Sequence, residues 1–232
     1  GGRTVYCKLG KNSNYDAITM NTALLTQTLP RSAQARERFT YSEFCSRIHE
    51  QKADLIHGEI FMASPATIKH EDSVYFLAMV LRGFVKKKNL GLVVGSRVAM
   101  KLGEEDAPEP DIMFVQQERS HLLGNTEIFG PADVAIEMIS PGSRRLDAVE
   151  KKELYAAFGV PEYWLIDLQR QEAHFWRNEG GEWKDLPLDE HGIFRSSVIA
   201  GFWLRVDWLF AADQPDELEI IQMILAGDPE SF

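Results

Sequence analysis

The sequence is poor in cysteine and has no run of about eighteen apolar residues. Its two cysteines, Cys7 and Cys45, have neither the spacing of metal ligands nor the density of a disulfide scaffold, so we expect reduced thiols. The N-terminus lacks the charged-then-apolar order of a signal peptide. These absences predict a cytoplasmic protein with no membrane segment.

Positive charge is also scarce, since the formal net charge is −10. An acidic chain is a poor non-specific ligand for nucleic acid, because contacts of Lys and Arg with phosphate supply most of that affinity. The charge is unevenly distributed, however. Residues 213–232 hold six acids and no base, whereas six bases and no acid lie between Arg82 and Lys101. A basic face that contacts DNA and a solvated helix end at residues 86–88 both explain the second pattern.

Hydrophobic residues make up 44% of the 232 positions, which is enough for one substantial core. Residues 1–35 are polar and unpatterned, and we expect a flexible N-terminal arm there. Residues 36–212 have the periodicity of a folded domain, and 213–232 form an acidic C-terminal segment. The pattern predicts helices at 40–48, 70–89, 144–158 and 216–226, a hairpin at 53–64, and strands within 90–100, 110–116, 133–140, 161–168 and 172–178. This order is typical of an α/β fold, with a mixed sheet flanked by helices.

Two carboxylates lie in strand-like apolar runs. Asp111 opens the run DIMFV, and Glu137 lies in the middle of AIEMI. A carboxylate in a buried strand must be paired, protonated or bound to a cation to offset its desolvation. Side chains alternate along a strand, so Glu137 shares a face with Ala135 and Ile139. The segment between the two runs is long enough for a loop, so both acids can meet at one edge of a sheet.

Two or three carboxylates at one edge suit Mg²⁺, and Mn²⁺ as an alternative. Such an ion polarises a phosphodiester and lowers the pKa of an attacking water. Glu59, which opens a strand after Gly58, is the third candidate. Taken singly, each acid is explained as well by a capped turn or by a surface ion pair.

The acids belong to longer stretches with a specific pattern. These are HGEIFMASPATIKH, EPDIMFV and AIEMISPGSRRLDAVEKKELYAAFGVPEYWLID, at residues 57–70, 109–115 and 135–167. They resemble the Uma family of restriction endonucleases, a branch of the PD-(D/E)XK nuclease superfamily, from about Phe39 to Trp208. The resemblance implies a restriction-endonuclease-like mixed central sheet flanked by helices. It also implies that Asp111 and Glu137 bind Mg²⁺ and that a lysine assists the water.

The lysine departs from the superfamily pattern. Ile139 occupies the usual position, two residues after the second acid, and the matching lysine of the Uma branch is Lys151, in the following helix. Lys152 is rotated from it by about 100°, so only Lys151 is expected to face the acids, together with Tyr155 one turn later. Asp147, one turn earlier, is either an ion-pair partner at the helix start or a direct participant.

The resemblance therefore implies a metal-dependent endonuclease acting on DNA, with Asp111, Glu137, Lys151 and Glu59 as catalytic residues. His70 matches a histidine of the family and either orients a water, contacts phosphate or makes a hydrogen bond at the helix entry. A catalytically silent module for DNA or protein interaction is the main alternative, favoured by the acidic charge, and a Mg²⁺-dependent phosphoesterase for smaller substrates is a weaker one. A double-strand cut needs two sites, which favours a homodimer.

Overall fold

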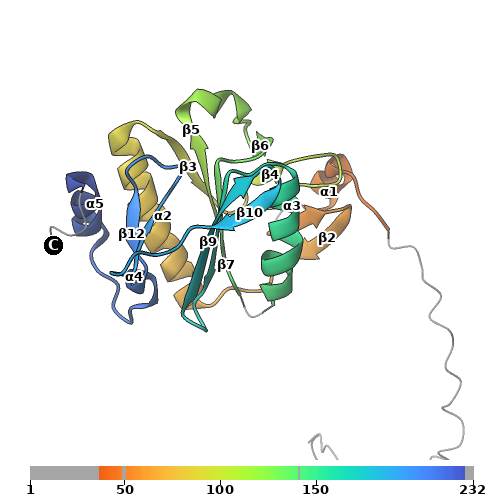
Figure 1. Cartoon of the computed structure of the whole chain (residues 1–232). Coiled ribbons are helices and arrows are strands. Elements are labelled where there is room, and N and C mark those ends of the chain that lie inside the picture. Colours follow the sequence, from red (N-terminus) through yellow and green to blue (C-terminus); the bar gives the residue numbers. More distant parts are fainter. Residues whose placement is uncertain (1–36, 49–50, 141, 228–232) are drawn as a thin grey trace, which may run out of the picture. The chain divides into compact units, whose positions relative to one another are not determined.

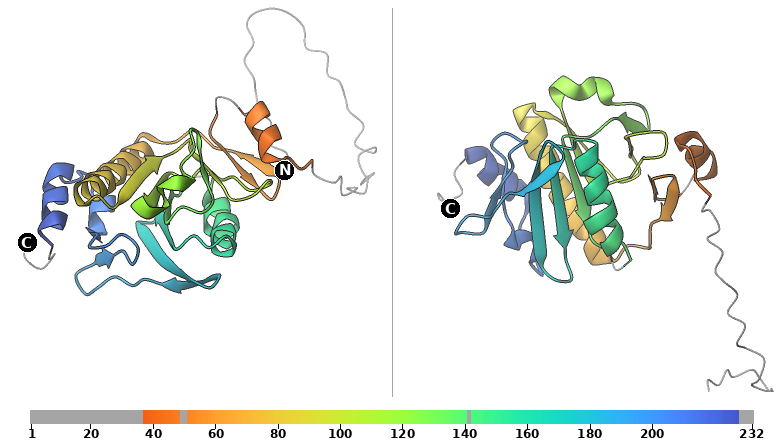
Figure 2. Two further views of the ribbon diagram at one scale, coloured as in Figure 1. Left: turned by 90° about the horizontal axis from the view of Figure 1, so that it is seen from above. Right: turned by 45° about the vertical axis from the view of Figure 1, so that its right-hand side comes forward.

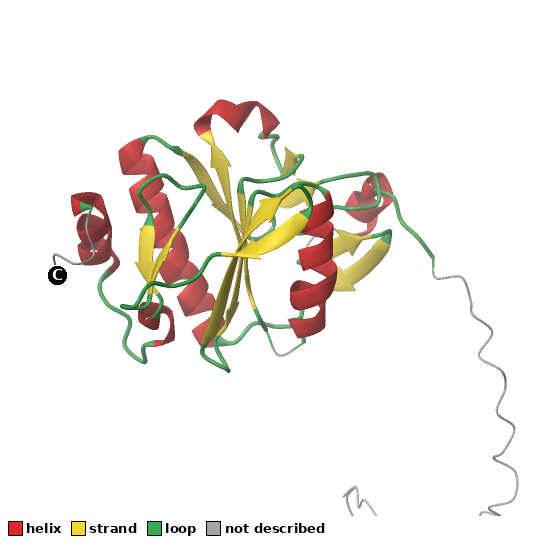
Figure 3. Ribbon diagram, in the orientation of Figure 1, coloured by secondary structure: helices red, strands yellow, loops and turns green. Residues whose placement is uncertain are grey.

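A six-stranded mixed sheet lies at the centre of the computed structural model, which describes residues 37–48, 51–140 and 142–227 (Figure 3). The arm expected over residues 1–35 lies outside this part. The strand order is β10-β9-β8-β7-β5-β3, with only β7 and β8 parallel. The bounds are β3 (Gly91–Gly95), β5 (Ile112–Gln116), β7 (Val134–Met138), β8 (Glu162–Asp167), β9 (Glu172–Glu179) and β10 (Glu182–Asp185). The expected mixed sheet is confirmed.

Two helices cover opposite faces of this sheet (Figures 1 and 2). Helix α2 (Ile68–Lys88) begins where the Thr67 side chain accepts a hydrogen bond from a backbone amide, and it ends at Asn89, whose φ of 55° is left-handed. Helix α3 (Lys152–Ala157) continues a π-helical segment, η2 (Leu146–Lys151). Gly159, with φ of 75°, follows α3 and lets the chain turn back into β8.

Side-chain alternation along the strands assigns the residues to two core layers. Ile136 of β7 and Trp164 of β8 pack in the layer that contains α2, whereas Ala135 and Tyr163 pack in the layer that contains Tyr155 of α3. Side chains two positions apart share a face, so Glu137 projects to the α3 side. The alternation thus places this carboxylate under the helix that carries Lys151.

A hairpin and a short helix precede α2. Strands β1 (Ala53–Ile56) and β2 (Glu59–Met62) pair antiparallel. The two residues between them, His57 and Gly58, have φ of 51° and 76°, as a type I′ turn requires. Helix α1 (Tyr41–Arg47) starts with a capping box between Thr40 and Glu43. Both elements were expected from the sequence.

The remaining elements are short. They are β4 (Ala99–Lys101), the 3₁₀ helix η1 (Gln117–Leu122), β6 (Glu127–Phe129), β11 (Ile193–Arg195), β12 (Trp203–Arg205), α4 (Asp207–Phe210) and α5 (Glu217–Ala226). The apolar run at 90–100 forms two strands, because the chain turns at Arg97, where φ is 75°. Ile220 and Ile224 of α5 are buried in the α2 layer. Within the described part of the chain, every helix is too short or too polar to span a membrane.

Candidate active site

Asp111 and Glu137 lie on neighbouring chain segments at one edge of the sheet. Strands β5 and β7 pair antiparallel, and Ile112 lies opposite Ile136. Asp111, which precedes Ile112, is therefore beside Glu137, which follows Ile136. Asp111 is 5% exposed and Glu137 is 2% exposed. Their proximity, expected from the sequence, is confirmed, and each buried charge requires a partner.

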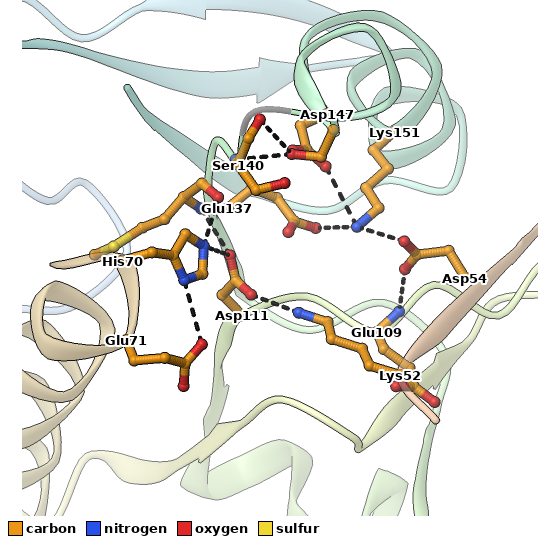
Figure 4. Close-up of polar contacts among 12 residues, drawn as sticks. Lys52, Asp54, His70, Glu71, Glu109, Asp111, Glu137, Ser140, Asp147 and Lys151 are labelled. Carbon is orange, nitrogen blue, oxygen red and sulfur yellow. Dashed lines mark hydrogen bonds and ion pairs between the residues drawn. The ribbon is translucent and has the colours of Figure 1, made fainter. Parts of the chain in front are cut away.

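Lys151 supplies positive charge to this edge (Figure 4). Its Nζ lies 3.0 Å from Glu137 Oε1, 3.0 Å from Asp54 Oδ2 and 3.5 Å from Asp147 Oδ1. Burial alone would lower the pKa of Lys151, but Asp54 and Glu137 raise it well above its ordinary value. The ammonium therefore stays charged and links three carboxylates. The adjacent Lys152 lies over the ring of Trp176, so only Lys151 faces the acids, as expected.

Glu137 has a second donor in Tyr155, whose hydroxyl donates to Oε1 at 2.7 Å. Burial raises the pKa of Glu137 to about 8, Lys151 opposes that shift, and the negative charges of Asp147 and Asp111 add to it. Burial and the charge of Glu137 also raise the pKa of Tyr155, so the phenol remains a donor. Glu137 is thus a carboxyl group whose charge is only partly compensated.

Asp111 is held by contacts from three other parts of the chain. Its Oδ1 lies 2.5 Å from Lys52 Nζ, and its Oδ2 accepts the backbone N–H of Met138 at 2.8 Å. Although burial would raise the pKa of Asp111, Lys52 and this N–H lower it below its ordinary value. His70 Nε2 lies 3.7 Å from Oδ2 and 2.9 Å from the Met138 carbonyl oxygen, to which it donates in the matching tautomer.

The third carboxylate of the site is Asp54, in β1. It is 5% exposed, contacts Lys151, and accepts the backbone N–H of Glu109 at 2.7 Å through Oδ1. Glu59, the residue expected in this place, pairs with Ile56 beside the hairpin turn and lies outside the cavity lining. Asp54 lies on the same strand as Ile56 but two positions further from the turn, and there it contacts Lys151. A catalytic role for Glu59 stays a prediction without support from this geometry.

A π-helical turn positions Asp147 and Lys151. Such turns are rare and frequently occur at functional sites, because the extra residue rotates the side chains that follow. Both residues are 2% exposed, and both face the carboxylate cluster. Burial raises the pKa of Asp147, which Lys151 opposes. Of the two roles that the sequence left open, Asp147 is observed as an ion-pair partner of Lys151.

The cluster opens into a cavity of about 380 Å³. Two lysines and four buried acids line this cavity, and each acid is no more than 5% exposed. The lysines are Lys52 and Lys151, and the acids are Asp54, Asp111, Glu137 and Asp147. Small residues also line the cavity: Ser64, Ser96, Ser140, Gly142 and Ser143. The buried acids outnumber the lysines, so ionisation of all four would leave an excess of negative charge that an additional cation would compensate.

Comparisons with known proteins identify the family and the fold of this chain. The model of the Uma2 family, described as "Putative restriction endonuclease", matches residues 40–207. The chain belongs to the Uma2 family. A crystal structure described as "a putative nuclease belonging to DUF820 from Anabaena variabilis ATCC 29413" matches with a TM-score of 0.62 and 22% identity, over 74% of this chain and 97% of that chain. The expected nuclease-like fold is thereby confirmed. A comparison with curated proteins found no match.

Sequence reasoning missed two residues of this Uma2 site, Lys52 and Asp54. Asp54 interrupts the apolar run ADLI, which is the same signal that identified Glu137. Lys52 lies two positions earlier, on the same face of an extended chain. The sequence therefore contained the alternation of Lys52 and Asp54, but it did not reveal their partners, Asp111 just before β5 and Lys151 in η2.

Proposed function

We propose that this protein is a metal-dependent endonuclease that hydrolyses phosphodiester bonds of DNA. The observation that carries the proposal is the buried set of Asp111, Glu137 and Lys151, with Lys151 Nζ 3.0 Å from Glu137 Oε1. Membership of the Uma2 family supports it. The cavity beside the three residues gives a substrate access to them.

The residues fit a divalent cation with water ligands better than a cage made only of protein groups. Within residues 37–48, 51–140 and 142–227, no three His, Cys, Asp or Glu side chains form a group that could hold a metal. Mg²⁺ commonly uses only one or two carboxylates and keeps several waters. Asp111 and Glu137 would hold Mg²⁺ or Mn²⁺, and the ion would polarise the phosphodiester and lower the pKa of a water. The four buried acids support this assignment, because a bound cation would offset the repulsion that opposes their full ionisation.

The other residues position the two acids. Lys151 and Tyr155 both engage Oε1 of Glu137, so neither of these bonds uses Oε2. Asp54 and Asp147 fix the ammonium of Lys151, which would stabilise negative charge that develops on a phosphate bound at the site. His70 holds the end of β7 through the Met138 carbonyl and so orients Asp111.

A cleavage screen tests the proposal. Plasmid DNA, single-stranded DNA and RNA are incubated with the parent protein in Mg²⁺ or Mn²⁺, beside an Asp111→Ala control and an EDTA control. We expect metal-dependent cleavage of DNA by the parent and none in either control. Cleavage that persists in Asp111→Ala would contradict the assignment. An inactive parent would leave the catalytically silent interaction module as the better account.

A further inference from the structure

The two lysines of the site differ in how firmly they are held. Lys151 contacts three carboxylates, and its side chain is 3% exposed. Lys52 has one carboxylate partner among the ion pairs of the described residues, Asp111, and its side chain is 25% exposed. An ion pair that is open to solvent on one side is weaker and exchanges more readily than a buried network. Lys52 is therefore the more easily displaced of the two cations.

The Lys52 ammonium contacts Oδ1 of Asp111, the oxygen at which a metal ion could replace it. Oδ2 accepts the N–H of Met138 at 2.8 Å, within the sheet edge, whereas Oδ1 faces Lys52. Burial alone would lower the pKa of Lys52, but Asp111 and Glu137 raise it, so the ammonium is charged. A divalent cation that approaches Asp111 through the cavity meets this ammonium first, and two cations do not share one carboxylate oxygen without repulsion.

We propose that Lys52 is a displaceable counter-ion: it neutralises Asp111 without metal, yields that carboxylate to the metal, and then binds a phosphate of the nucleic acid. The inference rests on the proposed nuclease function. It gives Lys52 a role distinct from that of Lys151, whose ammonium is fixed in place by three carboxylates. Lys52 lines the cavity, so a short movement of its flexible stem brings it to an entering phosphate.

If Lys52 both competes with the metal and binds phosphate, one substitution should change the affinities for Mg²⁺ and for DNA in opposite directions. Lys52→Met keeps an apolar stem but removes the charge that competes for Asp111, so Mg²⁺ should bind about threefold to fivefold more tightly, as expected for loss of a partly exposed ion pair. The same variant should bind DNA more weakly, and its affinity should depend less on salt by about one phosphate contact. A purely structural lysine would not shift the two affinities in opposite directions.

The experiment combines calorimetric titration with Mg²⁺ and fluorescence anisotropy on a cleavage-resistant phosphorothioate duplex at saturating Mg²⁺. The matched control is Lys184→Met, because Lys184 also pairs with one carboxylate, Glu182, and is 52% exposed on β10, away from the cavity. We expect the control to behave as the parent in both titrations. Thermal unfolding of each protein verifies that the variants are folded.

The outcomes separate this inference from the nuclease proposal. Tighter Mg²⁺ binding with weaker DNA binding in Lys52→Met supports the displaceable counter-ion. Unchanged or weaker Mg²⁺ binding in Lys52→Met overturns it, and leaves the nuclease proposal standing if Asp111→Asn abolishes the Mg²⁺ binding of the parent. Absence of Mg²⁺ binding in both the parent and Lys52→Met overturns both proposals.

Discussion

Two neighbouring strands each bury a glutamate, and the two glutamates have different surroundings. Glu162 of β8 is fully buried, and both of its oxygens accept hydrogen bonds from neutral donors. Trp164 Nε1 and Ser196 Oγ donate to Oε1, each at 2.7 Å, and the backbone N–H and hydroxyl of Ser197 donate to Oε2 at 2.7 and 2.6 Å. This carboxylate is enclosed and lies outside the cavity lining.

Glu137 of β7 is almost as buried, but it faces a cation, other acids and a cavity. Side-chain alternation along β7 places Glu137 on the α3 side of the sheet. Alternation along β8 places Glu162 with Trp164 on the α2 side. Burial of a carboxylate alone therefore does not distinguish a structural acid from one proposed to bind metal in this fold. What distinguishes them is whether neutral donors satisfy both oxygens or whether the charge stays only partly compensated beside a cavity.

Removing the cation of the Glu137 cluster should produce the largest effect. Lys151→Met leaves Asp54, Asp147 and Glu137 buried without their shared partner, so we expect a loss of about 3–5 kcal/mol in unfolding free energy. Any DNA cleavage should fall at least about a hundredfold, as for loss of a preorganised electrostatic group. Urea unfolding and the plasmid assay measure the two effects.

The matched control for that variant is Lys152→Met. The Lys152 ammonium lies 3.4 Å from the Trp176 ring centroid, outside the carboxylate cluster. We expect a loss of about 1 kcal/mol or less and unchanged cleavage. Equal effects of the two substitutions would show that the cluster has no special role.

Conservative changes to the two glutamates should differ in the sign of their effect on stability. Glu162→Gln replaces one acceptor oxygen by an NH2 group, which faces either the donors of Trp164 and Ser196 or those of Ser197, so we expect a loss of about 1–3 kcal/mol in unfolding free energy. Glu137→Gln removes one charge from an acid-rich cluster, and we expect unchanged or higher stability in the absence of metal at pH 8. Paired urea titrations in EDTA check this contrast, and a large loss in Glu137→Gln would contradict it.

The stability of the metal-free protein should depend on pH through Glu137. The folded-state pKa of about 8 lies above the ordinary value of 4.5, so folding favours the protonated form. The stability that this group contributes is fully present below the unfolded-state pKa and is lost as pH rises toward 8. Glu137 should contribute up to about one proton to the slope of unfolding free energy against pH in the parent, beside contributions from Glu109 and Asp147, whose pKa values burial also raises.

Glu137→Gln isolates that contribution. Asp111 has a depressed pKa, so its effect appears below the ordinary carboxyl range and does not overlap the window from about pH 5 to 8. The slope in this window should become smaller in Glu137→Gln than in the parent. Equal slopes in urea titrations at pH 5, 6.5 and 8 would show that Glu137 keeps an ordinary pKa.

A smaller change in cleavage rate should show whether Asp54 or Glu59 is the third acid of the site. Asp54→Asn removes one of the carboxylates that orient Lys151, so cleavage should fall about tenfold or more, as for other groups that orient an active-site residue. Glu59→Gln changes a residue outside the cavity lining, and we expect cleavage within about twofold of the parent. The reverse order in initial rates of plasmid cleavage would restore Glu59 as the third acid.

The sequence predicts much of this site, because its signals are local. Alternation of side chains in β7 predicts the sheet face on which Glu137 lies. The helical rotation of about 100° per residue predicts that Lys151 and Lys152 point in different directions. The contacts of Lys52 and Asp54 depend on how the β1–β2 hairpin packs against β5 and η2, which no local pattern encodes. The same limit explains why Glu59 was expected in the place of Asp54: both acids lie on one hairpin, and only its packing distinguishes them.

Calorimetric titration of Mg²⁺ into the parent, Glu137→Gln and Glu162→Gln tests the contrast between the two glutamates most directly. If the Glu137 cluster is a metal centre and Glu162 is structural, the parent and Glu162→Gln should bind Mg²⁺ with similar affinity, while Glu137→Gln should bind it at least about tenfold more weakly. Equal Mg²⁺ affinity in the parent and Glu137→Gln would contradict the account.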